Sequence, residues 1–201
     1  MVVKLLIDSR EPDIFHSFAI PENCELHCTA LAIGDFQFMI DDDPIILVER
    51  KTVEDYHASI RDGRLREQKA RILSLWPSTR VIYLVEGDLR ANRGSGTSSR
   101  TLVSSILNTM FRDNIHVFHT RNIAETIFIM TEILYKLEKQ GITFMEAIST
   151  EERATKYEEQ QARGLVSVKK SENLSSGTVY KGMLCCVPGV SSKTADSIIA
   201  Q

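Results

Sequence analysis

The chain has no long apolar segment and no excess of positive charge. None of its apolar runs approaches the roughly 20 residues that a membrane-spanning helix needs. The first run, at residues 2–7, has too short an apolar core and no small-residue cleavage site for a secretory signal. We therefore expect a soluble, intracellular protein with no membrane partner.

Cysteine is also scarce, with four in 201 residues. Cys24, His27 and Cys28 have the spacing of half a zinc site, but no second pair with ligand spacing follows in the same region. Cys185 and Cys186 are adjacent, which is poor chelating geometry. Reduced structural thiols are the favoured interpretation, and they fit a reducing compartment.

The formal net charge is −3 at pH 7, which argues weakly against a nucleic-acid partner. Binding a phosphate backbone depends on local positive charge, however, and one segment has it. The basic residues of this segment are Arg61, Arg64, Arg66, Lys69 and Arg71.

Alternating strand and helix patterns predict an α/β domain over residues 1–145, with 43% apolar residues to form its core. We expect strands at residues 2–7, 24–32, 35–40, 44–51, 79–86 and 115–119, with the second and third paired. We expect helices after Pro12 and at residues 52–75, 101–112 and 123–140. The helix at 52–75 is broken near Asp62 and Gly63, and His57 is expected to lie partly exposed on it.

Composition changes after this domain. Residues 146–177 are rich in Glu, Gln, Lys, Ser and Arg, which predicts a linker. Residues 178–201 contain an apolar-Pro-Gly-apolar turn at Pro188-Gly189, followed by a short helical pattern that includes Lys193. This arrangement predicts a partial helix-hairpin-helix, and a plain helical turn is the alternative.

One strand carries a charged pair of chemical interest. Glu49 and Lys51 follow the apolar run at residues 45–48, and residues i and i+2 of a strand project to the same face. With Asp35 delivered from a neighbouring strand, two carboxylates could hold Mg²⁺ beside an ammonium group, which suits attack on a phosphodiester. An isolated E-x-K is more often a solvated strand end.

The surrounding residues favour the catalytic interpretation. Gly34-Asp35, Glu49-Arg50-Lys51 and Asp55 follow the pattern GD-x(n)-ERK-x(3)-D, and residues 7–12 and 60–68 match in the same order. Over these three segments the chain resembles the nuclease domain of the XPF/Mus family of structure-specific endonucleases, most closely the Mus-type catalytic subunit. The resemblance implies a restriction-endonuclease-like α/β fold with a central mixed sheet flanked by helices.

The resemblance also implies roles for individual residues. Asp8, Asp35 and Glu49 would bind Mg²⁺ or Mn²⁺, and Lys51 would orient or activate water. Supporting or DNA-binding roles would fall to Arg10, Glu11, Arg50, Asp55, Arg64, Gln68, Gly189 and Lys193. Among these, Arg50 and Arg64 would meet phosphates, Asp55 would hold Arg50 or Lys51, and Gln68 would order the site.

The expected function is metal-dependent hydrolysis of branched DNA in repair or recombination, by a homodimer or a heterodimer with a related subunit. A eukaryotic protein of this kind would be nuclear. Family members carry two hairpins in tandem, so Gln201 is expected to be a truncation point. The alternative is a nuclease-inactive scaffold subunit that binds DNA, although such subunits lose acids that this chain retains.

Overall fold

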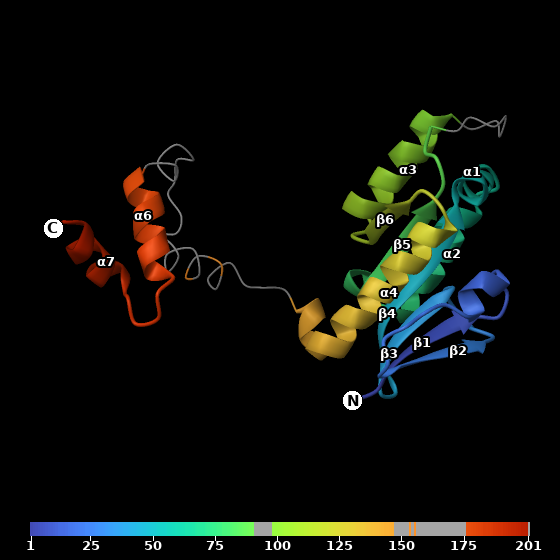
Figure 1. Ribbon diagram of the computed structural model, residues 1–201. Helices are drawn as coiled ribbons and strands as arrows, with labels where there is room; N and C mark the ends of the chain where they lie inside the picture. The colour runs from blue at the N-terminus through green and yellow to red at the C-terminus, as the bar shows by residue number, and fades with distance from the viewer. Residues whose placement is uncertain (91–97, 147–152, 154, 156–175, 201) are drawn as a thin grey trace. The chain divides into compact units, whose positions relative to one another are not determined.

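Figure 1 shows the computed structural model of the chain, which describes residues 1–90, 98–146, 153, 155 and 176–200. The chain divides into two compact units, Met1–Glu146 and Ala147–Gln201. Most of the predicted linker at 146–177 lies outside the described residues, so it stays a prediction.

The first unit is built on a six-stranded sheet in the order β2-β1-β3-β4-β5-β6. The strands are β1 (Val3–Asp8), β2 (Cys24–Thr29), β3 (Phe36–Ile40), β4 (Asp43–Thr52), β5 (Val81–Glu86) and β6 (His116–Thr120). Only β3 runs against its neighbours; every other pairing is parallel. The carboxyl ends of β1, β4 and β5 therefore meet the start of β3 at one edge of the sheet.

One expected pairing is wrong. The second and third strands were expected to pair, whereas β2 pairs in parallel with β1 and β3 lies between β1 and β4. Residues 30–35, between β2 and β3, lead the chain across β1 instead of forming a hairpin. Ser9 donates its amide to the Thr29 carbonyl at 2.9 Å, which fixes this crossing.

The helices largely agree with the sequence patterns. They are α1 (Val53–Arg61), α2 (Arg64–Leu75), α3 (Ser99–Phe111) and α4 (Ile123–Gln140), with a 3-10 turn η1 (Asp13–His16) after Pro12. The predicted break at Asp62 and Gly63 is confirmed, because Gly63 adopts φ +73° between α1 and α2. His57 is buried at 2% exposure, so its expected exposure is wrong.

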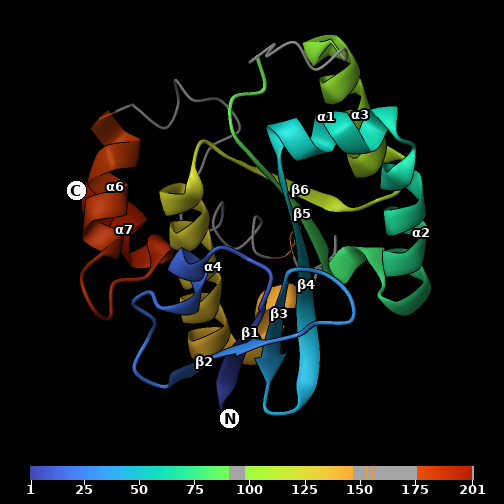
Figure 2. The same ribbon diagram turned by 90° about the vertical axis from the view of Figure 1, so that its right-hand side faces the viewer.

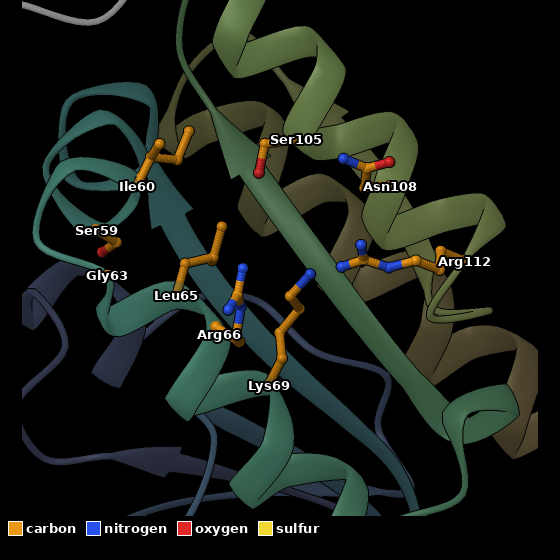
Figure 3. Close-up of a pocket in the computed structure, with 9 residues that line it drawn as sticks. All are labelled: Ser59, Ile60, Gly63, Leu65, Arg66, Lys69, Ser105, Asn108 and Arg112. Atoms are coloured by element: carbon orange, nitrogen blue, oxygen red, sulfur yellow. The ribbon is translucent and has the colours of Figure 1, made fainter.

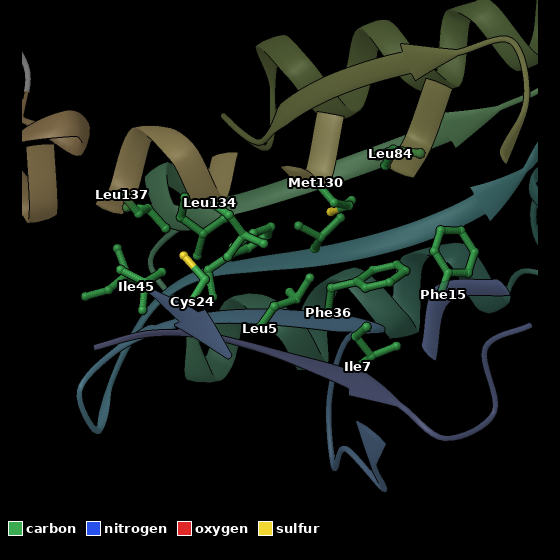
Figure 4. Packing of buried hydrophobic residues seen from close by; sticks show 14 residues of the cluster. Leu5, Ile7, Phe15, Cys24, Phe36, Ile45, Leu84, Met130, Leu134 and Leu137 are labelled. Atoms are coloured by element: carbon green, nitrogen blue, oxygen red, sulfur yellow. The ribbon is translucent and has the colours of Figure 1, made fainter. Parts of the chain in front are cut away.

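The two faces of the sheet are covered by different helices. Alternate residues of β4 supply both cores, because side chains alternate across a strand. Ile46 and Val48 pack with Met130, Leu134 and Leu137 of α4; Figure 4 shows this layer. Leu47 instead belongs to the core beneath α1, α2 and α3, which Figure 2 shows on the opposite side of the sheet from α4.

Over residues 176–200 of the second unit the structure describes the helices α6 (Ser176–Cys185) and α7 (Ser192–Ile199). Lys181 of α6 forms an ion pair of 2.7 Å with Asp196 of α7. Gly189 adopts φ +86° in the turn between them, and the Ser191 hydroxyl caps α7 by accepting from the Thr194 amide at 3.2 Å.

Two further expectations concern the whole described chain. All four cysteines are free thiols, as the sequence indicated. Within the described ranges, no helix is long and apolar enough to cross a membrane.

Candidate active site

Asp35 stands at the start of β3 because Gly34 lets the chain approach β4 closely. Gly34 has φ +70°, and a Cβ there would overlap the Leu47 side chain and lie 3.2 Å from the Val48 carbonyl oxygen. The Asp35 amide donates to that carbonyl at 2.9 Å. Its carboxylate accepts a hydrogen bond from the Arg50 amide at 2.7 Å, so the acid is held against the carboxyl end of β4.

Glu49 and Lys51 project from β4 on the same face as Leu47, as strand alternation predicts. Both are buried, at 9% and 6% exposure. The Lys51 Nζ lies 3.4 Å from the Glu49 Oε1, within reach of a charge-assisted hydrogen bond. The structure therefore brings the predicted acid and ammonium together in a partly desolvated place.

The electrostatics of this group show crowded negative charge. Burial, with the neighbouring charges of Glu49 and Glu11, raises the pKa of Asp35 to about 8. Tyr83 faces Glu49 across the β4–β5 pairing, and burial followed by the charge of Glu49 raises the pKa of its phenol. Lys51 contacts Glu49 directly, and the charge of Arg10 acts on both Asp35 and Glu49 from a greater distance.

Asp8 is held in a local hydrogen-bonded turn, and its expected role as a third metal ligand stays a prediction. Its carboxylate forms a two-point pair with Arg10, with both bonds at 2.7 Å. It also accepts from the amides of Arg10 and Leu31 at 2.8 and 3.0 Å. These bonds, led by that with the Arg10 side chain, hold the Asp8 pKa well below its usual range although burial opposes them. Both oxygens are thus already occupied.

Arg50 points to the opposite face from Glu49 and Lys51, and its side chain is 9% exposed, so its expected contact with phosphates stays a prediction. Its guanidinium binds Glu86 at 2.6 and 3.1 Å and Glu11 at 3.0 Å. It also lies 5.1 Å from the centre of the Phe15 ring. Arg50 therefore ties β4, β5 and the segment after β1 together, and Glu11 supports the site through it.

Asp55 has a different role from the one expected. It forms a reciprocal cap with Thr52 at the start of α1: the Asp55 amide donates to the Thr52 hydroxyl at 3.1 Å, and that hydroxyl donates to the Asp55 carboxylate at 2.7 Å. No bond to Arg50 or Lys51 is seen among the described residues. Asp55 thus fixes the turn that follows Lys51.

The basic segment that follows the break at Asp62 and Gly63 has both exposed and buried side chains. Arg64 is exposed and pairs with Asp62 at 2.8 Å, and its expected contact with a phosphate stays a prediction. Gln68 is half-buried, and its Oε1 has no partner in the described part of the chain. Lys69 was expected to add to the basic surface, but it is buried in an ion pair with Asp113 and donates to Thr109 at 3.1 Å.

Two residues of the site were missed by sequence reasoning. Glu86 binds Arg50 and accepts from the Thr126 hydroxyl at 2.6 Å. Tyr83 lies beside Glu49, and its buried hydroxyl has no partner within the described residues. Glu86 had a detectable signal, because it ends an apolar strand just as Glu49 follows one. Tyr83 had none, since a strand tyrosine is ordinary.

The donor set decides which metal this edge could hold. Within the described residues, no group of three or more His, Cys, Asp or Glu side chains is arranged to hold an ion. Asp35 and Glu49 remain as two neighbouring oxygen donors.

Gly189 and Lys193 belong to the second unit, where Lys193 is exposed at the start of α7.

Comparisons with known proteins agree with this arrangement. The ERCC4 domain family profile matches residues 7–133. The crossover junction endonuclease mus81 of Aspergillus fumigatus is 27% identical over 180 residues, which are 76% of this chain and 30% of that protein. The 3'-flap repair endonuclease Xpf of Saccharolobus solfataricus is 29% identical over 143 residues, 69% of this chain and 57% of the relative.

Solved structures show the same fold. XPF from Aeropyrum pernix matches with a TM-score of 0.54 and 23% identity, over 98% of this chain and 96% of that one. A complex of XPF from Aeropyrum pernix with DNA matches with a TM-score of 0.52 and 25% identity over the same shares. The chain spans 30% and 57% of the two curated relatives named above. With the family profile matched over more than half its length, the chain belongs to the ERCC4 domain family, and the resemblance noted in its sequence is confirmed.

Proposed function

We propose that this chain is a metal-dependent endonuclease that hydrolyses DNA phosphodiesters at flaps, forks or other branched structures, in repair or recombination. The observation that carries the proposal is the convergence of Asp35, Glu49 and Lys51 at one edge of the sheet. The substrate class is supported by relatives named as crossover junction and 3'-flap repair endonucleases, and by a similar structure in complex with DNA.

Asp35 and Glu49 would hold Mg²⁺ or Mn²⁺. Magnesium usually keeps several waters and takes only one or two carboxylates, so two neighbouring acids fit it. Their mutual repulsion, which helps to raise the pKa of Asp35, would be relieved by a divalent cation. Bound there, the cation would supply charge neutralisation and a more acidic water. Asp8 is left out of this set because Arg10 occupies both its oxygens.

Lys51 would orient the attacking water or a phosphate oxygen. An ammonium has three N–H donors, and Glu49 takes one of them. Because the Lys51 side chain is buried, its remaining donors are held in place rather than averaged over rotamers. Arg10 is 77% exposed and retains free N–H groups beside Asp8, which suits it to bind a phosphate.

The partners belong to the same proposal. Phe128 and Tyr135 of α4 are 58% and 49% exposed, which suits contact with an identical chain or a related subunit. The turn at Gly189 and the start of α7 present backbone amides and Lys193 to a DNA phosphate. Action on DNA would place the protein inside the cell, and in the nucleus of a eukaryote.

The test is cleavage of labelled 3'-flap, fork and linear duplex DNA in Mg²⁺ or Mn²⁺. The chain should cut the branched substrates, and Asp35→Asn and Lys51→Met should each lose at least about 100-fold in rate. Asp43→Asn, an exposed acid at the β3–β4 turn, is the control and should cut normally. Should the chain bind branched DNA yet cleave it with neither metal, alone or with a related subunit, the nuclease-inactive scaffold would replace this proposal.

A further inference from the structure

An open pocket lies between α2 and α3 and shares no residue with the group of Asp35, Glu49 and Lys51. Its volume is about 400 Å³, within the roughly 300–1,000 Å³ of small-molecule sites. Figure 3 shows its lining, which consists of Ser59, Ile60, Gly63, Leu65, Arg66, Lys69, Ser105, Asn108 and Arg112. None of these is acidic.

Three cationic side chains converge on this cavity. Arg66 and Lys69 come from α2, and Arg112 follows the last residue of α3. In Figure 3 their nitrogen atoms point toward the same space between the two helices. Arg66 and Arg112 are exposed and Lys69 is buried, and an anion bound among them would relieve their mutual repulsion.

Each cation keeps a donor for a ligand. Arg66 has no ion-pair or hydrogen-bond partner in the part of the chain that the structure describes. Lys69 gives two donors to Asp113 and Thr109 and retains a third. Arg112 contacts Asp113 through Nε at 3.4 Å, which leaves both terminal nitrogens. Three cations against the single carboxylate of Asp113 leave two positive charges.

Neutral groups complete the lining. Gly63 precedes α2 without a side-chain cap, so the first amides of that helix keep free N–H donors beside the cationic groups. Ser59 is buried, at 6% exposure, and brings a hydroxyl to the lining. Ile60 and Leu65 form an apolar wall, and the Asn108 amide can both donate and accept.

We propose that this cavity binds the phosphate monoester of a nucleotide. A monoester carries about −1.5 to −2 charges at neutral pH, which matches the two uncompensated cations. Phosphate alone would leave most of the cavity unfilled, whereas the apolar wall and Asn108 suit an attached sugar and base. The site is independent of the proposed nuclease function.

The test is calorimetric titration of the whole chain with deoxyadenosine monophosphate, with deoxyadenosine and with inorganic phosphate, without divalent metal. The nucleotide should bind at least about tenfold more tightly than the nucleoside or phosphate. Arg66→Gln and Arg112→Gln should each weaken it about tenfold, the scale of one charge-assisted hydrogen bond. Arg71→Gln, an exposed arginine of α2 outside the cavity, should stay within twofold. Unchanged thermal midpoints would show that the variants fold.

Equal binding of nucleotide and nucleoside, or unchanged binding by both cavity variants, would overturn the proposal. Competition with a short DNA strand identifies the source of the phosphate. If only a strand with a terminal phosphate competes, the ligand is a strand end; if neither strand competes, it is a free nucleotide. Equal competition by both strands would indicate a backbone diester and contradict the monoester. Repeating the titration with Asp35→Asn keeps the result separate from cleavage.

Discussion

Replacing Arg50 by methionine should destabilise the first unit strongly and is the sharpest test of its structural role. Methionine keeps the length of the side chain but removes the guanidinium that binds Glu11 and Glu86. Both acids are then left about nine-tenths buried, at 13% and 10% side-chain exposure, without their cation. The contact with the Phe15 ring is lost as well.

The expected cost is about 3–5 kcal/mol in the free energy of unfolding. That is the range for breaking a buried ion pair by removing one partner, because the remaining charge stays desolvated. The contact over an aromatic ring adds about 0.5–2 kcal/mol. Protonation of Glu11, whose pKa burial already raises, returns part of the loss, so the lower half of the range is expected below neutral pH.

Urea unfolding followed by tryptophan fluorescence measures this directly. Trp76 is the only tryptophan and lies at the end of α2, so it reports on the first unit. Arg64→Met is the matched control, because Arg64 is exposed and pairs only with exposed Asp62; it should cost less than about 0.5 kcal/mol. If Arg50→Met left the unfolding free energy unchanged and only weakened DNA binding, the structural role would be refuted.

Three other predictions test separate parts of the first unit. Gly34→Ala should lower the free energy of unfolding by about 2–4 kcal/mol, because φ is positive and the added Cβ overlaps β4. Gly63→Ala should lower it by about 1–2 kcal/mol, because φ is similar but the surrounding space is open. Equal losses of the two variants in urea unfolding would contradict this. In metal-free buffer, the Asp35 contribution to stability should fall as pH rises from about 4 to about 8, because the folded carboxyl holds a proton that the unfolded chain has released. The difference in thermal midpoint between the parent chain and Asp35→Asn, measured at several pH values, reports this contribution. A difference that stays constant or grows as pH rises would be inconsistent with the prediction. Lys69→Met should lower the free energy of unfolding by about 3 kcal/mol, because it leaves the Asp113 carboxylate without its cation. Adding Asp113→Leu should restore at least about half of that loss, because it removes the unpaired charge. A further loss in the double variant would show that the two residues are not coupled.

The central strand β4 and the charged residues at its end could be predicted from the sequence alone. A β-branched apolar run that ends in E-R-K fixes which side chains share a face, and the structure has Glu49 beside Lys51 as expected. The bounds of α4 were also predicted, because Asn122 caps its start and Gly141 follows its end. Local patterns of three to five residues determine both features.

Two of the missed features depend on pairings distant in sequence, and one on a local turn. Arg50 is buried because β5 places Glu86 beside it, 36 residues further along the chain. The pairing of β2 with β1 is likewise a matter of sheet order, which strand propensity does not encode. Asp8 looked like a third ligand because it ends a strand at the correct edge. Its pairing with Arg10 is a local turn that strand patterns do not predict.

The most direct test of the central claim is a titration of the chain with Mn²⁺, followed by the electron paramagnetic resonance signal of the free ion. We expect one Mn²⁺ site, which Asp35→Asn and Glu49→Gln should each abolish or weaken at least about tenfold. Asp55→Asn should retain it, because Asp55 caps α1. Binding that survives both site variants, or that disappears only with Asp8→Asn, would contradict the assignment of Asp35 and Glu49 as the metal ligands.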